Sequence, residues 1–379
     1  MTLSSVIILF LFSLAAAKFL CASPADFQTS NPALQTKEFK KQKEGKEIPL
    51  HRFLFEKGKK LGKGAYGKVK AAAGIEPKLV IKKVESNDYA ILDAMKKEIA
   101  TLKELCGKDP KKTYKDLFEC ESTAIAGFKG CVEKRDEIYI FQEALYMDLK
   151  SSDAKSKYRA LSGGKKAQVM VDLIRKFQNI HNKHIVHSDI KPDNIMMKNN
   201  DFNDLRVVDF GFSGKEGTKG VGGSLLYLPP ERYRSSFLTI QGDIYSLAIS
   251  LAVMEKSAFK TIHRMNDICF IQTPGRFCWE KLEKGLEKAF KKSRKTDFLL
   301  NVFLKATDYD LNKRYKSMSQ FAEAITKVAR NLPGFGSNPE EVPKSAFDRF
   351  LNFIGLGGSN RDRILTSETI RIEKNSLII

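Results

Sequence analysis

The chain has 379 residues, of which 42% are hydrophobic and 10% aromatic, and its formal net charge is +20. This hydrophobic content is enough for a packed core and excludes a globally disordered chain, and the length allows two modest domains or one large bilobal domain. The charge comes from lysine clusters scattered along the sequence, which either solvate helix faces or favour an acidic protein or an anionic membrane surface as a partner. No nucleic-acid-binding motif accompanies them, so nucleic acid is not expected as a partner.

The first segment in chain order is an uncharged apolar run from Val6 to Ala17. Its length suits the hydrophobic region of a signal peptide and is too short for a membrane-spanning helix. Small residues precede Asp26, which predicts a signal peptide over residues 1–25 that is cleaved before this aspartate. The alternative is an uncleaved helix that is buried or anchors the chain. A signal peptide implies a protein that is secreted or lies in the lumen of the secretory pathway.

Residues 26–52 are polar and rich in lysine, and we expect a basic leader there. Between Phe53 and Val84, β-type runs broken by glycines predict an antiparallel sheet. Apolar residues then recur at helical spacing from Tyr89 to Leu105. An irregular, lysine-rich insertion follows from Cys106 to Ser122, and two further strands are expected over residues 125–133 and 137–143.

The chain from residue 144 onward is predicted to be mainly helical. Apolar periodicity indicates helices over the following ranges: 165–183, 241–255, 279–291, 297–307 and 318–331. The coarse picture is a small β-rich lobe followed by a larger α-helical lobe, which is an α+β fold. After Pro333 the composition shifts to Gly, Pro and Ser, and we expect a C-terminal tail over residues 331–379.

Five cysteines remain once the predicted signal peptide is removed. In a secreted protein, an odd number leaves at least one thiol free or bonded to another chain. Cys269 and Cys278 are close enough in the sequence to pair, as are Cys120 and Cys131, and the fifth is Cys106.

A glycine-rich stretch with the pattern GxGxxG runs from Leu61 to Val69. Gly62, Gly64 and Gly67 would let backbone N–H groups approach phosphates, with Leu61 beside them, and Val69 would cover an adenine ring. The same pattern opens dinucleotide-binding folds, where a helix follows the glycines. Here a strand-like run follows instead, which argues against a dinucleotide site.

Lys82 lies in the next predicted strand, and Glu98 lies in the helix that follows. Lys82 would hold the α- and β-phosphates of a nucleotide, and Glu98 would fix the direction of its ammonium group. Lys83 is expected to face the opposite side of the strand. Taken alone, this lysine and glutamate would be interpreted first as surface residues.

The passage from Ile185 to Asn194 (IVHSDIKPDN) carries the strongest chemical signal, and the sequence VVDFG follows it. Asp189 is placed to accept or orient an acceptor hydroxyl, and Lys191 is placed to neutralise a γ-phosphate. Asn194 and Asp209 supply the hard oxygen ligands that Mg²⁺ prefers.

These motifs resemble those of the eukaryotic protein kinase family, in the same order and at similar spacing, over residues 53–330. The resemblance implies a bilobal fold, with an N-lobe over residues 53–143 and a C-lobe over residues 144–330. It also implies ATP and Mg²⁺ as cofactors and serine or threonine side chains of proteins as acceptors. Gln142 would be the gatekeeper, and the backbone from Glu143 to Leu145 would be the hinge that holds adenine.

By the same resemblance, Glu231 and Arg314 form a structural ion pair and Asp243 braces the catalytic loop. Ser188 stands where the family usually has an arginine before the catalytic aspartate, as in the non-RD kinases. We therefore expect an activation segment that needs no phosphate. Thr218 and Ser224 are the residues whose substitution would test this.

Two other functions are compatible with parts of the pattern. A pseudokinase is a binding module on the same fold, but its usual mark is the loss of the lysine, the base or the metal ligand, and all of these are present. A small-molecule kinase of the aminoglycoside or choline type shares the HxDxxxxN loop, whereas the glycine loop and Lys191 favour a protein substrate.

A predicted signal peptide on a basic, divergent kinase domain is similar to the rhoptry kinases of apicomplexan parasites. That similarity implies export into a host cell. A kinase of the lumen of the endoplasmic reticulum or Golgi is the competing hypothesis. In either case we expect a monomer.

Overall fold

The computed structural model describes residues 50–63, 67–72, 79–107, 120, 122–220, 222–233, 235–255, 282–287 and 297–336. The chain divides into two compact units, residues 1–335 and residues 336–379, and only the first contains described elements. The predicted signal peptide and most of the basic leader and C-terminal tail lie outside the described residues. Within the described residues, no helix has both the length and the apolarity needed to cross a membrane.

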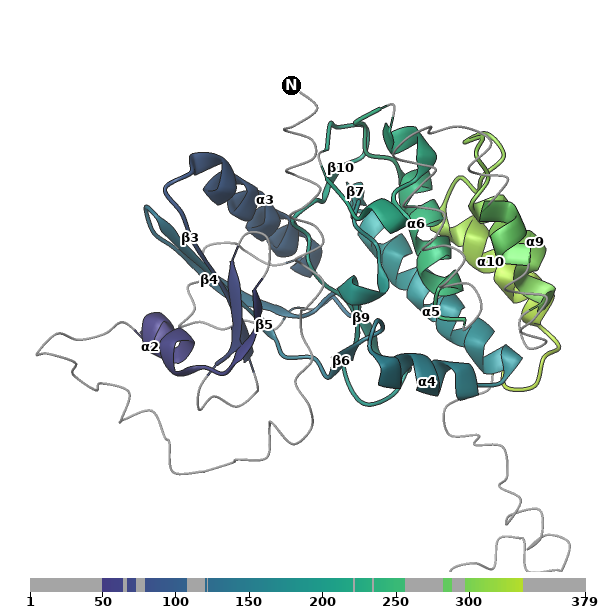
Figure 1. Cartoon of the computed structure of the whole chain (residues 1–379), viewed down its shortest axis with the longest axis horizontal. Helices are drawn as coiled ribbons and strands as arrows, with labels where there is room; N and C mark the ends of the chain where they lie inside the picture. Colours follow the sequence, from purple (N-terminus) through teal and green to yellow (C-terminus); the bar gives the residue numbers. More distant parts are fainter. Residues whose placement is uncertain are drawn as a thin grey trace, which may run out of the picture. The chain divides into compact units, whose positions relative to one another are not determined.

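Five strands form an antiparallel sheet in the order β1–β2–β3–β5–β4 (Figure 1). The strands are β1 (Lys60–Lys63), β2 (Lys68–Ala71), β3 (Leu79–Glu85), β4 (Phe128–Glu133) and β5 (Glu137–Glu143). Side chains alternate between the two faces, so Ile81 and Phe141 share one face, while Lys82 and Ile140 share the other. One face packs on α2 (Leu50–Lys57), and the other packs on α3 (Tyr89–Cys106).

The segment from residue 50 to 57 corrects the prediction, because it is a helix where the sequence indicated the start of the β region. Leu54 and Phe55 of α2 are buried in one cluster with Ile81, Tyr139 and Phe141 of the sheet. Short apolar runs do not distinguish a strand from a buried helical turn, and here the packing against the sheet decides.

Helix α3 agrees with its prediction within one residue. Asp88 caps its first turn by accepting a hydrogen bond from the backbone N–H of Ala90, and Gly107 ends it in the left-handed conformation, with φ of 78°. Its buried residues include Leu92, Met95 and Ile99. These apolar contacts hold the helix, and with it Glu98, against the sheet.

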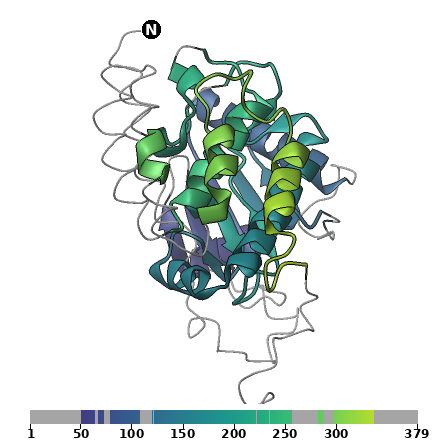
Figure 2. The same ribbon diagram turned by 90° about the vertical axis from the view of Figure 1, so that its right-hand side faces the viewer.

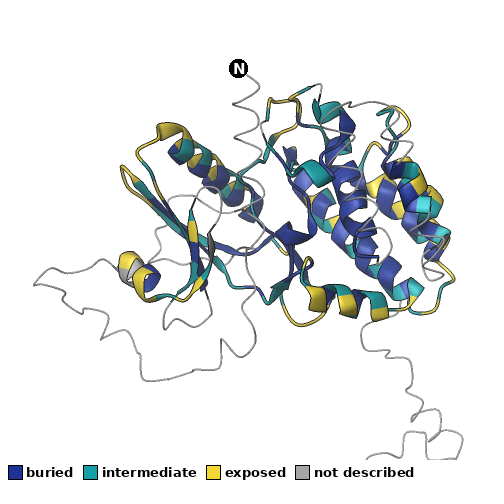
Figure 3. Ribbon diagram, in the orientation of Figure 1, coloured by how far each residue is buried: buried dark blue, intermediate teal, exposed yellow. Residues whose placement is uncertain are grey.

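The rest of the described chain is mainly helical (Figures 1 and 2). The helices are α4 (Ser152–Ala160), α5 (Gly163–His181), α6 (Ile240–Ala252), α9 (Leu300–Ala306) and α10 (Met318–Ala329). Every residue of α6 from Gly242 to Ala252 is buried, so this helix forms the centre of the lobe (Figure 3). Of the helix predicted over residues 279–291, residues 282–287 are described and helical.

Short two-stranded and three-stranded ladders lie between the sheet and the helices. They consist of β6 (Met147–Asp148), β7 (Ile185–Val186), β8 (Ile195–Met197), β9 (Leu205–Val207) and β10 (Gly214–Lys215). β6, β8 and β9 form one ladder, and β7 pairs with β10. These ladders set the ends of the loops that carry the candidate site.

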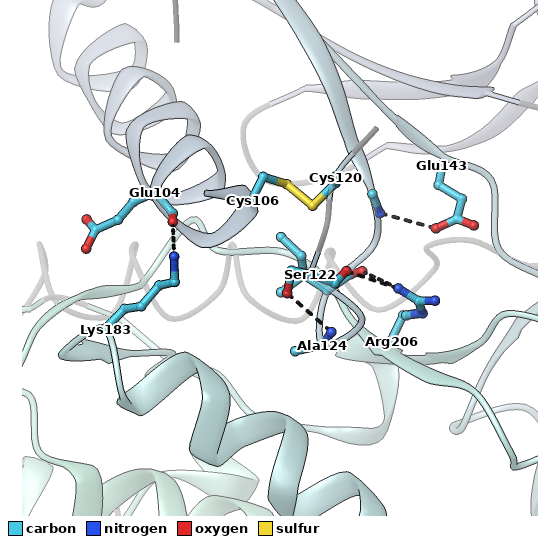
Figure 4. The surroundings of a disulfide bond; sticks show 10 residues. Glu104, Cys106, Cys120, Ser122, Ala124, Glu143, Lys183 and Arg206 are labelled. Carbon is cyan, nitrogen blue, oxygen red and sulfur yellow. Dashed lines mark hydrogen bonds between the residues drawn. A yellow bond between two sulfur atoms is a disulfide. The ribbon is translucent and has the colours of Figure 1, made fainter. Parts of the chain in front are cut away.

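The disulfide pattern also differs from the prediction. Cys120 is bonded to Cys106 at the end of α3, not to Cys131 (Figure 4). Cys131 lies in β4 as a free thiol, and burial raises its pKa to about 11. The Cα atoms of Cys106 and Cys120 lie 4.8 Å apart, a separation that a disulfide spans without movement of the backbone. Cys269 and Cys278 lie outside the described residues.

Candidate active site

Lys82 of β3 and Glu98 of α3 form a buried ion pair. Lys82 Nζ lies 2.8 Å from Oε2 and 3.0 Å from Oε1 of Glu98, and 3.4 Å from Oδ1 of Asp209. Burial opposes the ammonium charge, but Glu98 and Asp209 outweigh it and raise the pKa of Lys82. The lysine is therefore a fixed cation beside the carboxylate of Asp209.

Lys83 faces the other side of the sheet, as predicted. Its ammonium group lies 2.8 Å from Glu85 and 2.9 Å from Glu137. Two adjacent lysines of one strand thus have separate sets of partners.

Asp243, in the first turn of α6, holds the loop that precedes Asp189. Its Oδ2 accepts hydrogen bonds from the backbone N–H of His187 at 2.7 Å and from Nε2 of His181 at 2.9 Å. Its Oδ1 accepts from the backbone N–H of Ser188 at 2.9 Å. Ser188 has φ of 67°, a conformation that a non-glycine residue rarely adopts, and these bonds stabilise it.

Asp189 is surrounded by donors. Its Oδ2 accepts from Nζ of Lys191 at 2.7 Å and from Nδ2 of Asn194 at 3.1 Å, and its Oδ1 accepts from the backbone N–H of Ser224 at 2.7 Å. Lys191 also donates to Oγ of Ser224 at 2.8 Å. Burial opposes the charge of Lys191, but Asp189 outweighs it, and the pKa of the lysine is raised.

His187 is fully buried, and both its ring nitrogens are occupied. Nδ1 accepts the backbone N–H of Asp189 at 3.2 Å, so the proton lies on Nε2, which donates to the carbonyl of Val208 at 3.1 Å. This histidine therefore braces the loop on both sides and has no nitrogen left for proton transfer.

Asn194 and Asp209 are brought together by the pairing of β8 with β9. Ile195 lies opposite Val207, and the backbone N–H of Val208 donates to the carbonyl of Asn194 at 3.0 Å. The amide nitrogen of Asn194 is engaged by Asp189, so its side-chain oxygen is the atom left for a cation. Burial raises the pKa of Asp209, but Lys82 and Lys191 outweigh this and lower it, so the carboxylate is ionised. One amide oxygen and one carboxylate fit Mg²⁺.

Most of the predicted nucleotide-contacting residues are described, but Gly64 lies outside the described residues. Leu61 and Gly62 lie in β1, and Val69 of β2 is buried. A Cβ on Gly67 would come within 2.2 Å of the carbonyl of Lys83, so close packing on β3 requires glycine there.

The expected hinge, from Glu143 to Leu145, begins at the last residue of β5. The N–H of Glu143 already donates to the carbonyl of Gly127 at 2.8 Å, and its carboxylate lies 2.9 Å from Lys198. Leu145 is buried, in a cluster that includes Met196.

Glu231 and Arg314 form a two-point ion pair. Arg314 Nη1 lies 2.9 Å from Oε1 of Glu231, and Nη2 lies 2.8 Å from Oε2. The guanidinium group also lies 5.0 Å from the ring centroid of Tyr245. These contacts fix the end of the segment that carries Ser224.

Two contacts near the site were not predicted from the sequence. Arg232 donates to the carbonyls of Gly220 and Gly222 at 3.3 Å each, which holds the segment before Ser224. Lys150 lies 2.7 Å from Asp193, the residue before Asn194. The sequence offers a signal for each contact: an arginine directly after Glu231, and an aspartate between Lys191 and Asn194. Neither signal indicates which group the side chain binds.

Comparisons with known proteins agree on one family. Residues 55–322, more than half of the chain, match the protein kinase domain family. An Aurora kinase of Debaryomyces hansenii is 26% identical over 304 residues, 76% of this chain and 64% of the relative. Serine/threonine-protein kinase 4 homolog A of Dictyostelium discoideum is 29% identical over 227 residues, 57% of this chain and 45% of the relative.

A third relative is the dual specificity mitogen-activated protein kinase kinase dSOR1 of Drosophila melanogaster, 30% identical over 180 residues, 46% of this chain and 44% of the relative. The chain thus spans less than two thirds of the length of these three relatives. A crystal structure of a kinase domain superposes with a TM-score of 0.50 at 15% identity, over 70% of this chain and 93% of that one. The predicted bilobal kinase fold is confirmed.

Proposed function

The chain belongs to the protein kinase family, and from this premise we propose that it is an active kinase that transfers the γ-phosphoryl group of ATP to serine or threonine hydroxyls of proteins. The observation that supports this most is the position of Asp189, which accepts hydrogen bonds from Lys191, Asn194 and Ser224. Phosphoryl transfer depends mainly on positioning and on neutralising charge, and this arrangement supplies both.

Each polar group of the site has a distinct task in this proposal. Lys82, fixed by Glu98, binds phosphate oxygens of ATP, and Lys191 neutralises the transferred group. Asn194 and Asp209 would hold Mg²⁺, which neutralises phosphate charge when bound. A carboxylate oxygen has two lone pairs, so Oδ1 of Asp189 can accept the acceptor hydroxyl while it keeps the N–H of Ser224.

The test is phosphorylation of a generic basic protein with labelled ATP and Mg²⁺. We expect Asp189→Asn and Lys82→Met to lower the rate by about 100-fold or more. Lys83→Met is the matched control, because its side chain faces the other side of the same strand, and its rate should stay near wild type. Equal signal from wild type, Asp189→Asn and Lys82→Met would reject catalysis and indicate a pseudokinase. Activity toward sugars or amino alcohols instead of protein would indicate a small-molecule kinase.

We further propose that the activation segment is competent without a phosphate, as in non-RD kinases. Ser188 replaces the arginine that would receive the phosphate, and backbone pairing supports the segment instead. The backbone N–H of Gly217 donates to the carbonyl of Leu238 at 2.9 Å, and the backbone N–H of Gly220 donates to the carbonyl of Ser236 at 2.8 Å. Thr218→Ala should therefore keep activity within about twofold of wild type. Loss of activity, together with phosphate on Thr218 of the wild type, would contradict this.

We also propose that residues 1–25 are a signal peptide and that the protein works in the secretory lumen or after export into a host cell. The disulfide between Cys106 and Cys120 supports an oxidising route, since such bonds are rare in reducing compartments. ATP is scarce outside cells, so a working site needs delivery to a nucleotide-rich compartment. We expect the protein to act as a monomer on protein substrates.

A further inference from the structure

Charged side chains join the end of helix α3 to the activation segment, residues 209–231, and to the turn before the catalytic loop. Nζ of Lys215, in β10, lies 2.5 Å from Oε1 of Glu104 in the last turn of α3. It also lies 3.0 Å from the carbonyl oxygen of Lys183. Nζ of Lys183 in turn donates to the carbonyl oxygen of Glu104 at 2.6 Å (Figure 4). Each of these residues therefore contacts the other two.

The end of α3 favours this arrangement. The last carbonyl groups of an α-helix have no N–H partner within the helix, and the helix dipole favours a cation beside them. The N–H of Gly107 donates to the carbonyl of Lys103, and the ammonium group of Lys183 donates to that of Glu104. The turn before β7 thus supplies a cap for α3.

Backbone pairing fixes the place of Lys215 in the fold. It lies opposite Ile185 in the ladder of β10 with β7. The next N–H, that of Glu216, donates to the carbonyl of His184 at 3.0 Å. Since β7 leads directly to the loop of Asp189, the start of the activation segment and the catalytic loop form one backbone unit.

Helix α3 connects this unit to the nucleotide site. Glu98 precedes Glu104 by about 9 Å along the helix axis, and its carboxylate fixes Lys82. A packed helix moves as a rigid element, so the position of its last turn also sets the position of Glu98. The side chains of Glu104 and Lys215 are 43% and 50% exposed, so their pair is of modest strength.

We propose that Glu104 and Lys215, with Lys183, are positioning residues that take the place of an activation-segment phosphate. This inference rests on the proposed kinase function and on the phosphate-free activation segment. A phosphate that orders such a segment acts as an anion held by basic side chains. Here the anion is the carboxylate of Glu104, which belongs to α3 itself. The ordered segment therefore holds the helix that orients Lys82.

The experiment measures steady-state kinetics of phosphatase-treated protein, with a generic basic protein as acceptor and ATP as the varied substrate. We expect Glu104→Gln and Lys215→Met each to raise KM for ATP by about threefold, the effect of one partly exposed ion pair. The reason is that Glu98 then holds Lys82 less firmly. KM for the acceptor protein should stay at the wild-type value. The double variant should raise KM for ATP no further than either single variant, because the two side chains form one contact.

Two further variants separate this contact from a general effect of charge. Lys215→Arg keeps the cation, so its KM for ATP should stay within about twofold of wild type. Lys219→Met is the matched control, because it removes an exposed lysine of the same segment, whose backbone bridges to Phe237. Its KM for ATP should equal that of wild type.

An unchanged KM for ATP in Glu104→Gln and Lys215→Met would overturn the proposal. Independent effects would also overturn it: the double variant would then show the product of the two single increases, about ninefold. The same holds for an equal rise in Lys219→Met. Loss of wild-type activity on phosphatase treatment would overturn the phosphate-free segment and this proposal with it. A wild type with no signal above Asp189→Asn, treated or untreated, would overturn the kinase function on which both rest.

Discussion

Asp243 is one carboxylate that satisfies three donors of the catalytic loop and of α5: the N–H groups of His187 and Ser188 and Nε2 of His181. In Asp243→Asn, one of the two acceptor oxygens becomes an NH₂ group that faces a donor. At least one buried N–H then loses its partner, which costs about 1–3 kcal/mol of unfolding free energy. We expect this loss in urea unfolding, and a fall in kcat of about tenfold or more as the loop loosens.

The control for this change is Asp88→Asn at the start of α3. Asn and Asp cap helices about equally well, so its unfolding free energy should stay within about 0.5 kcal/mol of wild type. If Asp243→Asn were as stable as Asp88→Asn and as active as wild type, the bracing role of Asp243 would be wrong.

Asp204, which is not one of the catalytic groups, should make the unfolding free energy depend on pH. Its carboxylate lies 2.8 Å from Nε and 2.7 Å from Nη2 of Arg206, and 3.3 Å from Lys176. Burial opposes its charge, but Arg206 and Lys176 outweigh burial and lower its pKa. An aspartate whose folded pKa is lowered stabilises the fold fully above its unfolded pKa of about 3.9, and this contribution is lost as the pH falls through the folded value.

The measurement is urea unfolding of wild type and Asp204→Asn between about pH 3 and pH 7. The gap in unfolding free energy should be constant near neutral pH and should shrink as the pH falls below about 4. A gap that stays the same across the whole range would show that the charge of Asp204 does not stabilise the fold.

The disulfide connects helix α3 to the segment that pairs with strand β9. α3 carries Glu98 and ends at Cys106, and Cys120 opens the segment that reaches Ala124 (Figure 4). The carbonyl of Ala124 accepts the N–H of Val207 at 2.9 Å, two residues before Asp209. The bond therefore links the helix that carries Glu98 to a segment whose backbone pairs with β9, the strand that ends two residues before Asp209.

Loss of this bond should weaken both stability and nucleotide binding. Cys106→Ser frees a loop whose ends are 14 residues apart, and for such a loop we expect a loss of about 3 kcal/mol in unfolding free energy. KM for ATP should rise, because Glu98 is held less firmly. A dithiol reductant should likewise lower the unfolding free energy of wild type and raise its KM for ATP. Cys131→Ser should behave as wild type both with and without the reductant. Unchanged stability of reduced wild type would contradict the prediction.

At the scale of elements, the sequence predicted the helices whose apolar residues recur with a clear helical period. α3, α5, α6 and α10 present apolar residues at helical spacing along a buried face, and their predicted ends lie within about three residues of the observed ones. α4 was missed because only Ala154 and Tyr158 of its nine residues are buried, which leaves almost no apolar period. Helix α2 was missed because its short apolar run is buried against a sheet that only the whole fold provides.

At the scale of the whole molecule, the order of the lobes and the site motifs were predictable because phosphoryl transfer requires particular residue types in a fixed order. The partners of those residues were harder to predict from the sequence. The disulfide between Cys106 and Cys120, the contacts of Arg232 and the pair of Lys150 with Asp193 depend on closeness in space between segments that the sequence does not align. The spacing of residues within a motif can be obtained from the sequence, whereas the distance between two loops is known only once the chain is folded.

The predicted compartment depends on the first residues of the chain and, at the scale of the whole molecule, decides whether the disulfide can form. Expressed in full in a eukaryotic cell, the protein should enter the secretory pathway and lose residues 1–25. Mass spectrometry of secreted material should find Asp26 as the first residue, and alkylation without reduction should leave Cys106 and Cys120 unmodified and Cys131 modified after unfolding. A chain that starts at Asp26 should remain in the cytosol, where thiols are kept reduced, and it should be less stable by the contribution of the missing bond. Met1 retained on lumenal material would contradict cleavage, and equal stability of the two preparations would contradict the link between compartment and fold.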